Sequence, residues 1–178
     1  IRYVRTHATE YEGDSNNIFL MGESAGAHLS MMAVCGGSSF DDPVDNLQVT
    51  TDVRGVLELY GPTDCAGHVS TPEFMALSDE EAMRSPYTTV ANRCPRNELA
   101  ARLAALSPLH YVEKGVQLPP ILMAHGEEDK MVPIWHAEKM YEELTAAGAI
   151  VEYTRLKNAG HGNWRFYDDT MMNKYAMF

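Results

Sequence analysis

The sequence G-E-S-A-G at residues 22–26 is the feature that most limits how this chain can fold. It follows a short, continuous apolar run at residues 18–21 and leads into residues 24–34, which are rich in Ala, Leu and Met. The apolar run is typical of a strand buried on both faces, and the Ala-rich segment is typical of a helix. A serine flanked by glycines between the two predicts a sharp, strained turn that lifts the Ser24 hydroxyl above a sheet.

The remainder of the chain continues the alternation of strands and helices. Further strands are predicted at residues 53–60, 120–124 and 150–156, and further helices at residues 133–147 and 164–178, with residues 2–11 as a helix tail stopped at Gly13 and residues 38–49 as a loop. Because strands that alternate with helices form parallel sheets, we predict a mostly parallel α/β fold with flanking helices.

Residues 62–118 differ from this pattern. They predict short helices, one beginning with a capping box formed by Ser78 and Glu81, and another over residues 96–106 with Leu99, Leu103 and Leu106 on one face. We therefore expect a single domain over residues 1–178, with residues 62–118 as a lid-like helical insertion.

The charge of the chain excludes some classes of function. Lys and Arg total 14 against 25 Asp and Glu, for a net charge of −11, so a basic surface for nucleic acid is not expected.

No apolar run approaches the roughly 20 residues of a membrane-spanning helix. Residues 1–13 do not resemble a signal peptide, which favours the cytoplasm, although a chain that begins with Ile leaves the compartment open. The oligomeric state is not predicted.

The cysteines do not indicate a metal site. Cys35, Cys65 and Cys94 form no CxxC pair and no zinc-ligand spacing, so free, buried thiols are the favoured interpretation. A disulfide between Cys65 and Cys94 is the alternative. No metal or other cofactor is expected.

Two later segments supply partners for Ser24. A serine hydroxyl needs a base that is itself held in place, and such partners follow later strands in the order serine, acid, histidine. Asp129 follows the third predicted strand and His161 lies in a glycine-flanked turn after the fourth. We predict Ser24 as nucleophile, His161 as base and Asp129 as orienting acid, with the backbone N–H of Ala25 as an oxyanion donor at the helix N-terminus.

Each of these residues also has a structural interpretation. The G-x-S-x-G segment could be a plain turn, Asp129 an acid at a helix N-terminus, and His161 a turn residue, while His125 is expected only to form a local hydrogen bond. The joint occurrence of the three candidates in the right order at strand ends favours the catalytic interpretation.

The segments IFLMGESAGAHLS, HGEEDKMVP and NAGHG resemble the esterase branch of the α/β-hydrolase family, in particular carboxylesterases and acetyl- or feruloyl-esterase-like, lipase-like members. In the family's HGxxDxxVP pattern the acid is the Asp, which matches Asp129 rather than Glu127 or Glu128. The resemblance implies hydrolysis of a small-molecule or polysaccharide-linked ester through an acyl-enzyme. An amidase similar to kynurenine formamidases, or an inactive or non-catalytic binding member, are the alternatives.

The chain departs from the family at its N-terminal side. It has no HGGG-type loop, which in the family supplies the second oxyanion donor, and its predicted strands correspond to the last ones of the family's larger sheet. We therefore expect part of a longer protein, in which the strand at residues 18–21 becomes an apolar edge.

Contacts with the substrate are the least defined prediction. Glu23 and Trp164 are candidate substrate-binding residues, although Trp164 is expected more to pack into the last helix, and the insertion's Phe74, Met75 and Tyr87 suit an apolar pocket.

Overall fold

The computed structural model describes residues 1–42, 44, 48–112 and 117–178. Parts of the predicted loop 38–49 and of the predicted insertion 62–118 therefore lie outside the described residues. In the described chain, four strands form one parallel sheet in the order β1-β2-β3-β4. The strands are β1 (Phe19–Glu23), β2 (Gly55–Leu59), β3 (Ile121–Gly126) and β4 (Val151–Leu156). The predicted parallel α/β sheet is confirmed.

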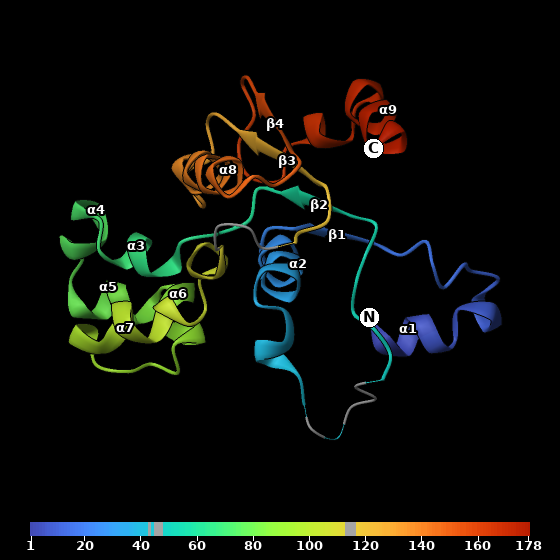
Figure 1. Ribbon diagram of the computed structural model, residues 1–178. Helices are drawn as coiled ribbons and strands as arrows, with labels where there is room; N and C mark the ends of the chain where they lie inside the picture. The colour runs from blue at the N-terminus through green and yellow to red at the C-terminus, as the bar shows by residue number, and fades with distance from the viewer. Residues whose placement is uncertain (43, 45–47, 113–116) are drawn as a thin grey trace.

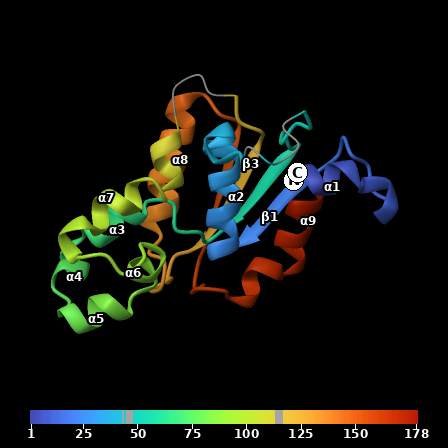
Figure 2. The same cartoon turned by 90° about the horizontal axis from the view of Figure 1, so that it is seen from below.

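Helices cover both faces of this sheet. One face packs against α2 (Ala25–Cys35) and α8 (Trp135–Ala147), and the other against the short η5 (Trp164–Tyr167) and α9 (Asp169–Met177), as the views in Figures 1 and 2 show. Met31 of α2 and Met140 of α8 are fully buried on the first face, and Phe166 of η5 on the second. Gly148 ends α8 in the left-handed conformation (φ 84°), which glycine adopts without strain.

An inner strand and an edge strand of the sheet differ in burial. Every residue of β3 is buried, whereas burial alternates along β1 and leaves Phe19 45% and Met21 53% exposed. The cause is pairing, because β1 has a hydrogen-bonded neighbour on one side alone in the described sheet. The prediction that this strand is buried on both faces is thus wrong, and the prediction of an apolar edge is confirmed.

The segment between β2 and β3 folds into short helices that gather to one side of the sheet (Figure 1). They are α3 (Cys65–Val69), α4 (Pro72–Met75), α5 (Asp79–Arg84), α6 (Pro86–Val90), η3 (Arg96–Glu98), α7 (Leu99–Ala104) and η4 (Pro108–Tyr111). The Ser78–Glu81 capping box is present, and Leu99 and Leu103 are buried. Residues of α3, α4, α5, α6 and α7 share a hydrophobic cluster of their own, whereas Leu109 and Tyr111 of η4 pack against the core that the sheet shares with α2 and α8.

The N-terminal segment is less regular than predicted. A single turn of helix, α1 (Arg2–Thr6), is followed by a 3-10 turn, η1 (Ala8–Tyr11), and Glu12 rather than Gly13 adopts the left-handed conformation, with φ 56°. A further 3-10 turn, η2 (Gly37–Phe40), follows α2.

All three cysteines are free and buried. Cys65 and Cys94 lie in the same hydrophobic cluster without forming a bond, so the favoured prediction of free thiols is confirmed. In the part of the chain that is described, no helix is both long enough and apolar enough to cross a membrane.

Candidate active site

Ser24 sits at the turn between β1 and α2 in a strained backbone conformation, with φ 52° and ψ −118°. Its backbone N–H donates to the carbonyl of Leu59 at 2.9 Å, which ties the turn to the end of β2. A Cβ on Gly22 would lie 2.2 Å from the carbonyl group of Gly26, whereas a Cβ on Gly26 would meet nothing within 4 Å. The turn therefore requires a residue without a side chain at Gly22 but leaves space for a methyl group at Gly26.

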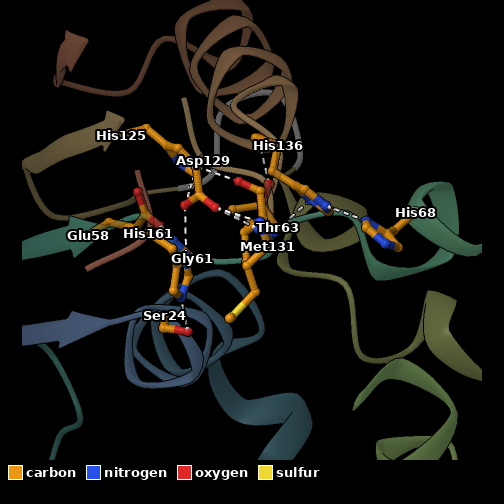
Figure 3. Close-up of polar contacts among 11 residues, drawn as sticks. Ser24, Glu58, Gly61, Thr63, His68, His125, Asp129, Met131, His136 and His161 are labelled. Atoms are coloured by element: carbon orange, nitrogen blue, oxygen red, sulfur yellow. Dashed lines mark hydrogen bonds and ion pairs between the residues drawn. The ribbon is translucent and has the colours of Figure 1, made fainter. Parts of the chain in front are cut away.

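The three predicted catalytic residues meet at the carboxyl ends of the strands (Figure 3). His161 Nε2 lies 2.9 Å from Ser24 Oγ, and His161 Nδ1 lies 2.7 Å from Asp129 Oδ2. The His161 side chain is 18% exposed and that of Asp129 is fully buried. This hydrogen-bonded order is the geometry in which a histidine can take a proton from serine while a carboxylate orients its ring.

The loop after β3 stabilises the ionised form of Asp129. The backbone N–H groups of Met131 and Val132 donate to Oδ1 at 2.9 Å each, and His125 Nε2 lies 3.4 Å from Oδ2. Burial by itself raises the pKa of this carboxyl group, but the hydrogen bonds from His125, Val132, His161 and Met131 outweigh it and lower the pKa to about 2. Asp129 is therefore a carboxylate at neutral pH.

The sequence indicated only part of the role of His125 and gave no role to Glu58, and both residues are buried beneath the site. His125 donates from Nε2 to the carbonyl of Val132 at 2.8 Å, which is the local hydrogen bond expected, but it also contacts Asp129. Glu58, the penultimate residue of β2, is fully buried and accepts a hydrogen bond from the N–H of Gly61 at 2.6 Å. Its signal in the sequence was an acid inside an otherwise apolar strand.

Comparison with known proteins agrees with this geometry. The model of the BD-FAE family matches residues 1–144. The chain belongs to the BD-FAE family.

Relatives of this BD-FAE chain carry the names of esterases. Esterase LipQ of Mycobacterium tuberculosis is 33% identical over 90% of this chain and 36% of its own length, and esterase LipC of the same organism is 32% identical over 91% and 38%. The isoprenylcysteine alpha-carbonyl methylesterase ICME of Arabidopsis thaliana is 24% identical over 100% and 41%. The chain thus spans less than half the length of these relatives.

Solved structures confirm the fold. A truncated form of a carbohydrate esterase from gut microbiota superposes with a TM-score of 0.81 at 25% identity, covering 99% of this chain and 63% of that one. A butyrate-bound esterase, Est2 of Thermogutta terrifontis, gives a TM-score of 0.69 at 24% identity, with 99% and 60% covered. The predicted resemblance to esterases of the α/β-hydrolase family is confirmed.

Glu23 lies beside the nucleophile of the BD-FAE chain but is already engaged. Its carboxylate accepts hydrogen bonds from the hydroxyl groups of Tyr60 and Tyr167. The bond from Tyr167 and then that from Tyr60 lower the pKa of Glu23. The ring of Tyr60 in turn packs against His161, with ring centroids 4.9 Å apart. Neither tyrosine was predicted.

The predicted substrate contacts farther out are not assembled into a pocket. Trp164 is 65% exposed and lies under the guanidinium group of Arg165, so its expected packing into the last helix is wrong. Phe74 and Tyr87 are buried in the insertion's own cluster, and Met75 is exposed. Their suitability for an apolar substrate group stays a prediction.

Two cavities lie away from the triad. One of about 360 Å³ lies within the insertion near Asp79 and Arg96, and one of about 440 Å³ lies between the N-terminal turns and Phe19. Ser24, Asp129 and His161 line neither. Across residues 1–42, 44, 48–112 and 117–178, no group of three or more His, Cys, Asp or Glu could hold a metal ion.

Proposed function

We propose that this protein is a carboxylic ester hydrolase in which Ser24 is the nucleophile, His161 the general base and Asp129 the orienting acid. The observation that carries the proposal is the continuous chain of hydrogen bonds from Ser24 Oγ through His161 to Asp129. The names of the relatives as esterases support the reaction class.

In the first half of the reaction, Ser24 Oγ attacks the ester carbonyl carbon while His161 Nε2 takes the hydroxyl proton. Asp129 accepts the hydrogen bond from His161 Nδ1 and stabilises the imidazolium that forms. The tetrahedral intermediate then collapses, the carbon–oxygen bond to the alcohol breaks, and the departing oxygen takes the proton from His161. The products of this half are an acyl-Ser24 ester and a free alcohol.

In the second half, His161 takes a proton from water, whose oxygen attacks the acyl carbon. Collapse of the second intermediate returns the proton to Ser24 Oγ and releases the carboxylic acid. In both intermediates the backbone N–H of Ala25, at the start of α2, is the proposed donor to the oxyanion. Removing one oxyanion donor typically slows such a reaction by about 10²–10³-fold. A second donor beside the Ala25 N–H would therefore raise the rate strongly.

We propose that the ester is a small molecule or is attached to a polysaccharide.

The insertion at residues 62–118 would act as a lid-like wall of the site, because its first helix is joined to α8. His68 Nδ1 of α3 lies 3.1 Å from His136 Nε2 of α8, and Lys139 Nζ of α8 lies 2.5 Å from Asp64 Oδ2 (Figure 3 shows the histidine pair).

The proposal is tested by substrate profiling of the 178-residue chain. We expect p-nitrophenyl acetate and butyrate to be hydrolysed, with N-formyl anilides cleaved at least about tenfold more slowly. Ser24→Ala or His161→Ala should lower kcat by about 10³-fold or more, as for other triads. Asp169→Asn, an exposed acid of α9, is the matched control and should be unchanged. Preference for the N-formyl compounds, or no turnover by folded chain, would contradict the proposal.

A further inference from the structure

We propose that Glu23 is a positioning residue for His161: clamped by Tyr60 and Tyr167, it holds the Tyr60 ring against the imidazole and places a second negative charge beside it. This inference rests on the proposed function and adds residues that neither the triad nor the substrate accounts for.

The clamp joins three elements around the nucleophile. Glu23 is the last residue of β1 and precedes Ser24, Tyr60 directly follows β2, and Tyr167 ends η5. Both tyrosine hydroxyl groups donate to the same carboxylate oxygen, Glu23 Oε2, and the two hydroxyl oxygens are 3.3 Å apart. One carboxylate therefore ties the strand that precedes the nucleophile to the end of β2 and to η5.

Aromatic contacts of its ring and a constrained backbone fix the position of Tyr60. Its ring packs against His161 at a centroid distance of 4.9 Å and an angle of 73°, and against Phe166 at 4.4 Å. Its backbone adopts the left-handed conformation (φ 45°), which is strained for a residue with a large side chain. Such strain persists only where surrounding contacts enforce it, and it gathers at functional sites.

The consequence for His161 is a fixed ring orientation. Its Nε2 must face Ser24 and its Nδ1 must face Asp129 at the same time. The Tyr60 ring forms a wall beside the imidazole, so a ring rotation that broke either hydrogen bond would meet this wall. Positioning of this kind has large effects on rate, because small displacements of a catalytic group slow the reaction strongly.

The charge of Glu23 acts in the same direction. The groups that face His161 are Ser24 from the turn, Asp129 from the loop after β3, Tyr60 after β2, and Glu23 from β1, with Tyr167 behind Glu23. Burial raises the pKa of Tyr60, so its hydroxyl stays neutral. Glu23 is thus the second carboxylate near the imidazole and stabilises its protonated form, as the intermediate requires, with an effect moderated by solvent because Glu23 is exposed.

The test is the pH profile of the phosphonylation of Ser24 by a neutral fluorophosphonate, in which the O–P bond forms as fluoride leaves, together with kcat and KM for p-nitrophenyl acetate. The variants are Glu23→Gln, Tyr60→Phe and Tyr167→Phe. Glu80→Gln, an exposed acid of the insertion, matches the change in charge, and Tyr153→Phe matches the loss of a tyrosine hydroxyl. Far-UV circular dichroism melting confirms that each variant is folded before its rates are compared.

We expect Glu23→Gln to lower kcat by about tenfold with KM changed less than about twofold, and to move the rising limb of the profile to lower pH by a few tenths of a unit. Tyr60→Phe should lower kcat without moving the limb as far, and Tyr167→Phe should have the smaller effect. Both controls should match the wild type.

The outcomes separate this inference from the proposed function. If the wild type reacts at Ser24 but Glu23→Gln matches it in kcat and in pH profile, the positioning role is overturned while the proposed function stands. A rise in KM with kcat unchanged also overturns it and identifies Glu23 as a substrate contact. If folded wild type does not react at Ser24, the proposed function itself fails, and the positioning role falls with it.

Discussion

At the scale of single residues, the turn at Ser24 depends on one close approach. Gly22 leaves room for the backbone of Gly26, while Gly26 itself faces open space. The two glycines of the same motif therefore do different things: Gly22 is required by sterics, and Gly26 is not.

We predict that Gly22→Ala displaces the turn, because its Cβ would lie 2.2 Å from backbone atoms that cannot move away freely. The free energy of unfolding should fall by about 1–3 kcal/mol, and reaction of Ser24 with a fluorophosphonate should slow by at least about tenfold. Gly26→Ala is the matched control and should be nearly neutral in urea unfolding. Equal losses from both substitutions would contradict the steric difference.

Glu58 makes stability depend on pH. Burial raises the pKa of its side chain to about 7, although His125 and the N–H of Gly61 lower it in part. Its Oε2 atom has no hydrogen-bond partner among the described residues. Because the folded state holds this proton more tightly than the unfolded state, the stability it contributes is full below about pH 4.5 and is lost as the pH rises through about 7.

We predict that the free energy of unfolding falls between pH 5 and 8 by an amount on the order of 3 kcal/mol from this group, and that Glu58→Gln removes most of that slope. Urea titrations at several pH values measure it, with Glu80→Gln as an exposed control. Asp129 does not interfere, because its lowered pKa makes it lose stability only as the pH falls toward about 2. Parallel pH slopes for wild type and Glu58→Gln would show that Glu58 is not the cause.

At the scale of elements, Asp64 is one of the residues that join the insertion to α8. Asp64 accepts a hydrogen bond from the N–H of Gly67 at 2.7 Å as the N-cap of α3, and it also pairs with Lys139 of α8. Asp64 is 2% exposed, whereas half of the Lys139 side chain is exposed.

We predict that Asp64→Ala lowers the free energy of unfolding by about 1–2 kcal/mol, mainly through the lost cap, and that Lys139→Ala costs less than about 1 kcal/mol, because the lysine is largely solvated. Thermal melting of the two variants compares them directly. A larger loss from Lys139→Ala would mean that the ion pair rather than the cap holds the joint.

The elements also show what the sequence could and could not predict. The triad was predictable because the G-x-S-x-G turn and the two later strand ends are each local patterns, and strand order then brings them together. The exposure of β1 did not follow from its apolar run, because it depends on which strand pairs beside it, and only the comparison with the family's larger sheet predicted an apolar edge. The clamp on Glu23 was not predictable, since its partners lie 37 and 144 residues away along the chain. No local pattern signals a contact of that kind.

At the scale of the whole molecule, the described sheet has an exposed apolar edge at β1. β3 is covered on every side, while β1 exposes Phe19 and Met21 along a free edge. The chain also spans only 36% of LipQ and 63% of the carbohydrate esterase. Even so, the strand ends still bring Ser24, His161 and Asp129 within hydrogen-bonding distance. We therefore expect the triad to assemble in the 178-residue chain.

The most direct test of this claim is intact-mass labelling of the 178-residue chain with a fluorophosphonate, followed by peptide mapping. We predict one adduct per chain, located on Ser24, and its loss in His161→Ala. An adduct on another residue, an adduct on Ser24 that persists in His161→Ala, or no adduct on folded chain would contradict it.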